Sequence, residues 1–359
     1  MTQAQTELAA LSRQILTDRA TPDRLAALER DGLGFDEALW ADLAGAGVLA
    51  AALPDGVGDG YGLAEQCSIL IEVGRTVAPV PYLESIACGA AAIARFGTSE
   101  QIARYAATAA AGDLVLTVAL AEPSGSAPTT AERSGDGWVL TGMKTAVPAG
   151  AAAEVFLVPA RTPEGTAVFC VESADQGVTV ERQKLITGPG AAQLELAGVA
   201  LRQDRLLGAG DELMPWLTAR ATVGVCALAL GTTQRALEMT ADYAKTREQF
   251  GRPIGAFQAV AQRLADAYID VEAIRLTMWQ AAWRLESGLP AAAEIATAKF
   301  WAAEGGHRVA HTAVHVHGGV GIDVSHPVHR YFAAAKRHEF ALGGATAQLL
   351  RLGDVLVAG

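Results

Sequence analysis

The sequence predicts an α+β protein in which an N-terminal helical domain, a middle antiparallel β domain and a C-terminal four-helix bundle follow one another. Apolar residues recur at three- and four-residue spacing as far as residue 113, which is typical of helices. Period two then takes over, and the helical period returns in longer runs near the C-terminus. These changes set the expected domains at residues 1–114, 115–210 and 211–359.

In the first domain, residues 35–49 and 63–73 have the clearest helical pattern, with Asp, Gly and Pro between them as stop and start signals. The first 18 residues form an amphipathic helix pattern that carries charges throughout and has no apolar core. We therefore expect no signal peptide.

The middle domain consists of short segments rich in β-branched and aromatic residues, separated by Gly, Pro, Ser and Asp turns. The expected strands are residues 115–120, 138–141, 154–159, 167–172, 178–182 and 193–196. Since no helix-length segment separates them, they favour an antiparallel sheet or small barrel over a doubly wound parallel sheet.

The C-terminal domain shows longer helical runs, joined by short connections such as residues 247–256. The runs are residues 214–246, 257–285, 291–316 and 326–357. Short connections are typical of an antiparallel bundle, and we expect this bundle to form the core of an oligomer.

Composition limits the classes of partner. The chain has 28 Lys plus Arg against 39 Asp plus Glu, a net charge of −11, and no long basic run, which argues against nucleic acid and against an anionic membrane surface. Mean hydropathy is +0.23, but apolar stretches such as residues 223–231 are shorter than the ~18–20 residues of a membrane span. We expect no membrane segment.

The cysteines and histidines carry two further expectations. Cys67, Cys88, Cys170 and Cys226 show no CxxC spacing, so we expect buried, reduced thiols in a cytoplasmic protein.

All seven histidines lie within residues 307–338, and three share one helical face at positions 307, 311 and 315. No Cys and few carboxylates accompany them, so we predict interface packing rather than a metal site.

Two motifs resemble the acyl-CoA dehydrogenase family. Residues 247–258 read REQFGRPIGAFQ, and residues 315–330 read HVHGGVGIDVSHPVHR. Weaker matches, in the family's order, lie at residues 39–54, 72–85, 119–126 and 142–150. The resemblance covers nearly the whole chain and implies an FAD-dependent enzyme that dehydrogenates the α,β bond of an acyl-CoA, with electron-transfer flavoprotein as electron acceptor.

The resemblance also implies which residues bind the cofactor. In the family, these two motifs reach across a subunit interface to the neighbour's flavin, where they hold the ADP end. The implied cofactor-binding residues are Arg247 and Gln249 on the diphosphate, Phe250 on the adenosine half, Phe257 and Gln258 along the same path, and the turn that includes His315, Gly318 and Gly319. The two glycines permit close backbone approach.

The catalytic base of the family is missing. Removing the α-proton of a thioester requires a carboxylate that faces the substrate, and the family uses a Glu. The matching position here is Leu342, Gly343 or Gly344, and the alternative register used by some members falls near Ala221. We predict no catalytic residue on this chain; the alternative base is Glu339.

The segment that would face the flavin ring also departs from the family pattern. Ala146, Val147 and Pro148 stand where the family has W-I-T, and proline has no backbone donor. The family's E-P-x-x-G-S-D segment is shortened at residues 122–126 and lacks its Asp.

The base and the flavin-ring segment, which form one half of the site, are lost. The two motifs that reach to the neighbour's flavin and hold its ADP end are intact. The chain therefore resembles the base-lacking subunit of the α2β2 acyl-CoA dehydrogenases of actinobacterial steroid side-chain degradation, in which a homologous catalytic subunit supplies the base. Alternatives are a self-sufficient homomer that uses Glu339, with CoA or a carrier protein holding the thioester, and a non-enzymatic scaffold or regulator.

Overall fold

The computed structural model describes residues 2–32 and 34–358, and its contacts divide the chain into two compact units. One unit comprises the N-terminal segment up to Pro22, Leu63–Ala78 and the chain from Thr222 onward; the other comprises Asp23–Gly62 and Pro79–Ala221. The domain boundaries near residues 114 and 210 stay a prediction, because they mark changes of period along the chain rather than contacts.

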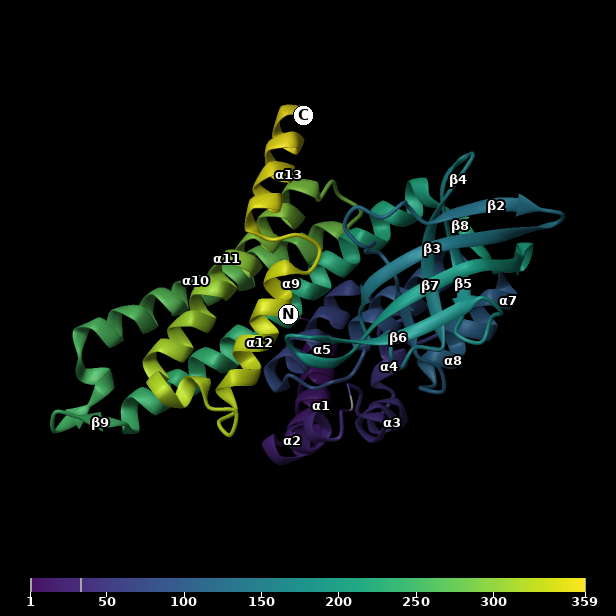
Figure 1. Cartoon of the computed structure of the whole chain (residues 1–359). Coiled ribbons are helices and arrows are strands. Elements are labelled where there is room, and N and C mark those ends of the chain that lie inside the picture. The colour runs from purple at the N-terminus through teal and green to yellow at the C-terminus, as the bar shows by residue number, and fades with distance from the viewer. Residues whose placement is uncertain (1, 33, 359) are drawn as a thin grey trace. The chain divides into compact units, whose positions relative to one another are not determined.

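The first unit is helical. Its described elements are α1 (Gln3–Arg19), α5 (Leu63–Thr76), α9 (Gly210–Thr246) from Thr222 onward, β9 (Glu248–Gln249), β10 (Arg252–Pro253), η4 (Ile254–Ala256), α10 (Gln258–Glu286), α11 (Ala292–His317), η5 (Gly318–Ile322), α12 (Val328–Phe340) and α13 (Ala345–Ala358). Figure 1 shows α10 and α11 running alongside each other, with β9 at the end of the α9 and α10 pair.

Local sequence explains how these helices begin and how closely they pack. At the start of α1 the Thr2 hydroxyl accepts the backbone N–H of Gln5, while the Gln5 side chain accepts the N–H of Thr2, which is a capping box. Two glycines allow α5 and α9 to approach closely, since a Cβ on Gly231 would lie 1.9 Å from the carbonyl oxygen of Ile71. Gly74 meets α9 in the same way.

The single helical run expected over residues 326–357 is wrong, because the chain turns between α12 and α13. Leu342 and Gly343 both have positive φ, 58° and 98°, which ends a right-handed helix. The side-chain amide of Gln348 donates to the carbonyl oxygens of both residues, at 3.0 and 3.2 Å, and so holds the turn. The turn includes residues 342–344, the position at which the resemblance implies the family's catalytic base.

The second unit contains a sheet and short helices. Its described elements are α2 (Pro22–Arg30) apart from its first residue, α3 (Glu37–Gly45), α4 (Val48–Ala51), η1 (Tyr82–Ala90), α6 (Ala91–Phe96), α7 (Ser99–Gln101), η2 (Ile102–Ala106), α8 (Ala107–Ala110), β1 (Leu116–Val118), β2 (Thr130–Ser134), β3 (Gly137–Val147), β4 (Val155–Thr162), β5 (Gly165–Glu172), β6 (Val178–Leu185), β7 (Gly188–Arg202), η3 (Gln203–Arg205), β8 (Leu206–Ala209) and the first part of α9.

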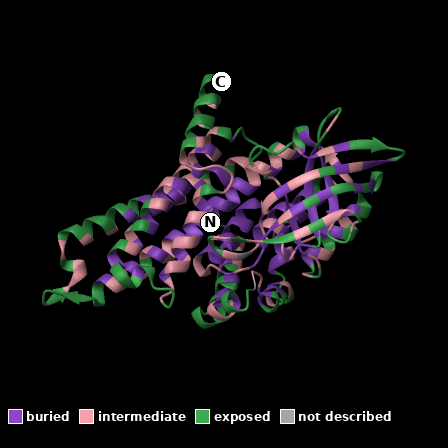
Figure 2. Cartoon of the chain, in the orientation of Figure 1, coloured by how far each residue is buried: buried purple, intermediate pink, exposed green. Residues whose placement is uncertain are grey.

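The described strands form one eight-stranded sheet in the order β6-β7-β3-β2-β4-β5-β8, with β1 beside β4. All six expected strands are confirmed. Pairing within the sheet is antiparallel, except that β1 and β2 each pair in parallel with β4. The sequence missed β2 and β8, which are short; β2 buries only Ala131. Trp138, Phe156 and Phe169 lie in the buried core of the sheet, and Figure 2 shows buried residues alternating with exposed ones along the later part of β7.

Two segments, Gly210–Thr246 and Val328–Val357, are long and apolar enough to cross a membrane by length and composition alone. In the first, 61% of the apolar window is buried within the chain, as in the core helix of a globular protein, and the second is interrupted by the turn between α12 and α13. The test is therefore only a weak indication of a membrane span.

The burial expected for the four cysteines is confirmed, and none of these four described residues forms a disulfide. Burial raises the pKa of Cys88, Cys170 and Cys226 to about 12, because an apolar interior disfavours the thiolate. These thiols are therefore inert packing groups rather than nucleophiles.

Candidate functional site

The segment that joins α9 to α10 is a small exposed hairpin, residues 247–256, which we call the arginine hairpin. β9 pairs with β10, and the turn between them has Phe250 and Gly251 in the left-handed region, at φ 54° and 76°. The hairpin continues directly from α9, since the backbone N–H of Arg247 donates to the carbonyl of Tyr243 at 2.8 Å. Our sequence prediction of a plain connecting loop lacked this strand pairing.

The arginine hairpin presents its functional groups outward. Phe250 is 91% exposed, and its ring forms a T-shaped pair with that of Phe257, with 6.1 Å between centroids. The guanidinium of Arg247 forms no ion pair with any described residue, whereas the nearby Lys245 is paired with Asp242 at 2.9 Å. A non-glycine residue held at positive φ marks local strain, which is often found in ligand clamps.

The second predicted segment is the turn at the end of α11, residues 318–322, which we call the glycine turn. Gly318 has φ 62° and ψ −136°, a conformation that side chains disfavour. A Cβ on Gly318 or Gly319 would meet nothing within 4 Å, so the backbone of the turn is open to an incoming group. His315 lies exposed one helical turn before it.

The structure brings these two segments together. Tyr243, in the last turn of α9, stacks on His317, the last residue of α11, with 4.4 Å between ring centroids. An unpaired cation, the exposed Gln249 amide, an exposed aromatic ring and an open glycine backbone thus lie at neighbouring sites of one unit. This donor set fits the diphosphate and adenosine of FAD.

The segment expected to face a flavin ring has its polar groups hydrogen-bonded to other residues of the chain. The backbone N–H of Ala146, held at φ 48°, donates to the side-chain oxygen of Gln183 at 2.7 Å. The Gln183 amide nitrogen donates to the Thr145 hydroxyl at 3.1 Å, and the Pro148 carbonyl accepts the hydroxyl of Thr117. These residues do not fit the ring half of FAD. The sequence reasoning missed Gln183.

The shortened segment at residues 122–126 is also engaged internally. Glu122 forms an ion pair with the buried Lys144 at 2.7 Å and accepts the backbone N–H of Thr129 at 2.8 Å. Burial would raise the pKa of Glu122, but these hydrogen bonds lower it below its usual range. Glu122 therefore stabilises the loop as a carboxylate.

The alternative base Glu339 is already paired. Its carboxylate lies 2.8 Å from the ammonium of Lys336 and 3.1 Å from Nδ1 of His307, and its side chain is 15% exposed. Burial would raise the pKa of Glu339, but the hydrogen bonds from Lys336 and His307 lower it overall. A general base works best with a pKa nearer the operating pH, so the arrangement favours a structural ion pair.

Neighbouring histidines contact one another as the helical spacing predicts, with His307 and His311 at 4.3 Å between ring centroids. Within residues 2–32 and 34–358, no group of three or more His, Cys, Asp or Glu side chains is arranged to hold a metal ion.

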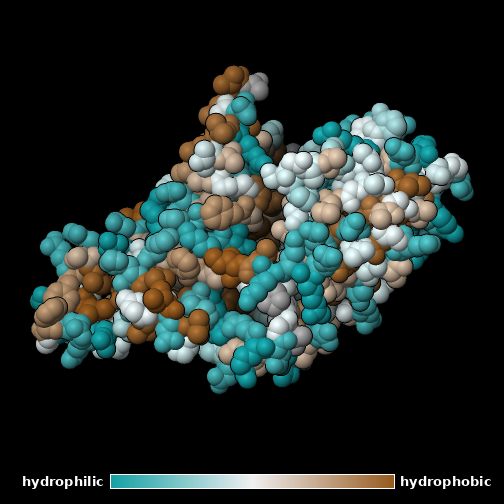
Figure 3. Space-filling view, in the orientation of Figure 1, coloured by the Kyte–Doolittle hydropathy of each residue, from teal (hydrophilic) through white to brown (hydrophobic). Residues whose placement is uncertain are grey.

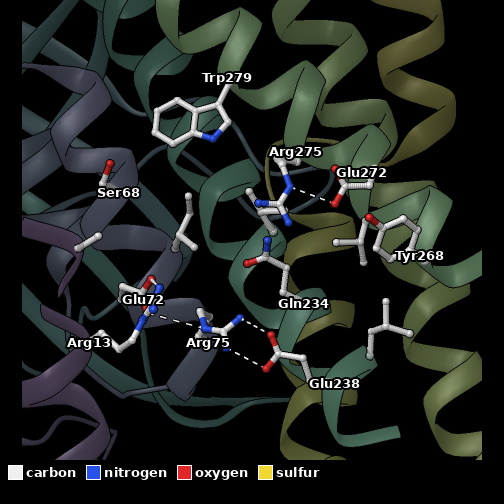
Figure 4. Close-up of a pocket in the computed structure, with 15 residues that line it drawn as sticks. Arg13, Ser68, Glu72, Arg75, Gln234, Glu238, Tyr268, Glu272, Arg275 and Trp279 are labelled. Atoms are coloured by element: carbon white, nitrogen blue, oxygen red, sulfur yellow. Dashed lines mark hydrogen bonds and ion pairs between the residues drawn. The ribbon is translucent and has the colours of Figure 1, made fainter. Parts of the chain in front are cut away.

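A cavity of about 420 Å³ lies among α1, α5, α9 and α10, away from the predicted residues. Figure 4 shows that its charged side chains pair with one another: Arg13 with Glu72 at 2.7 Å, Arg75 with Glu238 at 2.8 Å, and Arg275 with Glu272 at 3.1 Å. Because these charges neutralise each other, the cavity offers no particular site for an anionic ligand.

Comparison with known proteins gives consistent matches along the chain. Residues 2–113 match the model of the acyl-CoA dehydrogenase N-terminal domain, and residues 209–356 match that of the C-terminal domain. The chain is 49% identical to acyl-CoA dehydrogenase FadE27 of Mycobacterium tuberculosis, over 99% of this chain and 97% of the relative. It is 34% identical to FadE28 of the same organism, over 88% and 91%.

Solved structures agree. The crystal structure of the ChsE4-ChsE5 complex from Mycobacterium tuberculosis contains a chain that matches with TM-score 0.97 and 48% identity, over 100% of this chain and 98% of that one. A variant of the Tcur3481-Tcur3483 steroid ACAD matches with TM-score 0.93 and 43% identity, over 99% and 98%. Both of these relatives are named as complexes of two different proteins.

Proposed function

The chain belongs to the acyl-CoA dehydrogenase family of FAD-dependent oxidoreductases, and on this premise we propose that it is the non-base subunit of a heteromeric enzyme. It grips the nucleotide end of an FAD whose ring lies in the pocket of a homologous catalytic subunit. The assembly is α2β2, with one flavin for each pair of unlike chains.

One contrast carries this proposal. The segments that would hold the ADP end present exposed and open groups. In the segment that would face a ring, Gln183 binds the Ala146 N–H and the Thr145 hydroxyl, and the Thr117 hydroxyl of β1 binds the Pro148 carbonyl. A homomeric enzyme would need both halves on the same chain. A scaffold without flavin would need neither the unpaired Arg247 nor the open glycine turn.

Arg247, Gln249 and Phe250 of this chain have separate tasks in the proposed mechanism. Arg247 neutralises the diphosphate, which matters in a chain of net charge −11. Gln249 donates to the same group, and Phe250 packs on the adenosine. When bound, FAD supplies the acceptor for the hydride that leaves the β-carbon of the substrate. The partner supplies the carboxylate that removes the α-proton.

The substrate and the remaining partners are part of the same proposal. Because a similar structure is described as a steroid ACAD, we assign to the complex an acyl-CoA that carries a steroid side chain. The electron acceptor is electron-transfer flavoprotein, and the complex works in the cytoplasm.

The proposal is tested by the flavin content of purified protein. We expect the chain alone to be colourless and inactive, and the chain co-expressed with its genomic neighbour to yield a yellow complex with one FAD per heterodimer. The measurement is flavin absorbance against protein concentration, together with the mass of the complex. A yellow, active homomer would overturn the proposal.

Glu339→Gln separates the proposal from the homomeric alternative. In the assembled complex we expect turnover to change less than about twofold, because Glu339 is held by Lys336 and His307. Steady-state kinetics of the complex measure this, with Glu304→Gln, an ion-paired carboxylate on the same helix as His307, as a matched control. A fall of about 10³, within the range for a lost general base, would make Glu339 the base.

A further inference from the structure

We infer that His317 is a positioning residue that fixes the arginine hairpin against the glycine turn through its stack on Tyr243. The inference rests on the proposed function, because it concerns how this chain grips the nucleotide end of FAD. It assigns a positioning role to a residue within the predicted segment 315–319 that was not singled out as a cofactor contact.

The stack connects the two helix ends from which the arginine hairpin and the glycine turn begin. The rings of Tyr243 and His317 are nearly parallel, 23° apart, with centroids separated by 4.4 Å. On one side, the carbonyl of Tyr243 accepts the backbone N–H of Arg247 at 2.8 Å, so the tyrosine sets where the hairpin starts. On the other side, His317 directly precedes Gly318, whose φ of 62° opens the turn.

The His317 ring is held in place for this contact. Its side chain is buried, with the residue 3% exposed, and Nδ1 lies 2.8 Å from the carbonyl of Ala313. Since a carbonyl only accepts, Nδ1 carries a proton. Nε2 is buried and has no hydrogen-bond partner among the described residues. The His326 ring lies beside the His317 ring, with 5.1 Å between ring centroids. The hydrogen bond from Nδ1 to the Ala313 carbonyl therefore fixes the ring, and one face of the ring packs against Tyr243.

The geometry has a consequence for cofactor binding. The arginine hairpin and the glycine turn belong to helices that are far apart in sequence, so their spacing depends on tertiary contacts such as this stack. An aromatic pair of this kind corresponds to about three- to tenfold in an equilibrium constant. Removing the stack should weaken the binding of the adenylate half of FAD, which both segments contact, and leave the binding of the flavin half unchanged.

The test compares FAD with FMN, which lacks the adenylate half. The flavin-free heteromeric complex is titrated with each flavin, and binding is followed by flavin fluorescence. We expect His317→Leu to weaken FAD binding about three- to tenfold and to leave FMN binding within twofold. His317→Phe keeps a flat ring for Tyr243 and should bind FAD within twofold of the wild type. His311→Leu, on an exposed turn of the same helix, is the matched control and should match the wild type.

Other outcomes overturn the inference. Unchanged FAD binding in His317→Leu would show that the stack positions nothing, and equal losses for FAD and FMN would assign His317 to general folding. If His317→Leu fails to assemble, Tyr243→Leu removes the same stack from α9, and its ratio of FAD to FMN affinity carries the test. Arg247→Ala is measured in the same experiment to separate the proposed function from the positioning role. If Arg247→Ala binds FAD normally, the proposed function fails. If Arg247→Ala loses FAD affinity and His317→Leu does not, only the positioning role is refuted.

Discussion

Arg247→Ala should abolish the retention of FAD by the purified complex, with a fall in FAD affinity of about 10- to 100-fold. The guanidinium forms no ion pair with residues 2–32 or 34–358, so under the proposed function its donors are available to the diphosphate. Each hydrogen bond to a charged group contributes about 1.5–3 kcal/mol, and about 1.4 kcal/mol corresponds to tenfold in affinity. Flavin absorbance after gel filtration measures retention, and titration with FAD measures affinity.

Two further variants sharpen this prediction. Lys245→Ala removes the same charge two residues away, but its ammonium is already bound to Asp242, so this control should retain FAD. Arg247→Lys keeps a point charge without the planar fork and should fall between the two. If Arg247→Ala retains FAD as well as Lys245→Ala does, the hairpin does not hold the diphosphate.

Substitutions of Lys299 should give the largest loss of stability. Lys299 on α11 is fully buried, and its ammonium donates to the carbonyl of Glu339 at 3.1 Å, near the C-terminal end of α12. A cation at this end of a helix interacts favourably with its dipole. Lys299→Glu would put an unpaired negative charge in that place, and we expect a cost of about 3–5 kcal/mol in the free energy of unfolding. Lys299→Met fills the same space and should cost less, about 1–3 kcal/mol for the carbonyl left unpaired.

The pH dependence of unfolding distinguishes a charged lysine from simple packing. Burial lowers the pKa of Lys299 below its ordinary value of 10.5. Between the lowered pKa and 10.5 the unfolded chain binds more protons than the folded chain, so the contribution of Lys299 to stability rises with pH there. Denaturant unfolding at several pH values should show this rise in the wild type relative to Lys299→Met. A constant difference between them across that window would contradict the prediction.

Much of the architecture was accessible from periodicity because the relevant signals are local. The change from helical period to period two predicted the six strands, and the motif spacing placed Arg247 and Gly318 at helix ends. The absence of a carboxylate at residues 342–344 could be read directly. The resemblance to a known family supplied the roles of these residues, which periodicity alone does not give.

Other features depend on contacts that no local pattern encodes. Alternation from Val178 would put Gln183 on the outer face of its strand, but two consecutive exposed residues shift the pattern and turn it inward. Tyr243 and His317 meet only once α9 and α11 have packed. The helical period continues through Leu342, so the break there appears only in the backbone angles. Tertiary packing overrides propensity at each of these sites.

The exposure of Phe250 bears on how the cell handles the chain before assembly. Figure 3 shows hydrophobic residues at the surface of the hairpin end of α9 and α10 and along α13, where Leu350 and Leu356 are more than half exposed. Under the proposed function, a copy that has not assembled with its partner leaves these side chains in water, where exposed apolar surface promotes aggregation, chaperone binding and proteolysis. On the same proposal, the abundance of this polypeptide should follow the synthesis of its partner, because unassembled copies are removed. The cell must then produce the two chains in balanced amounts.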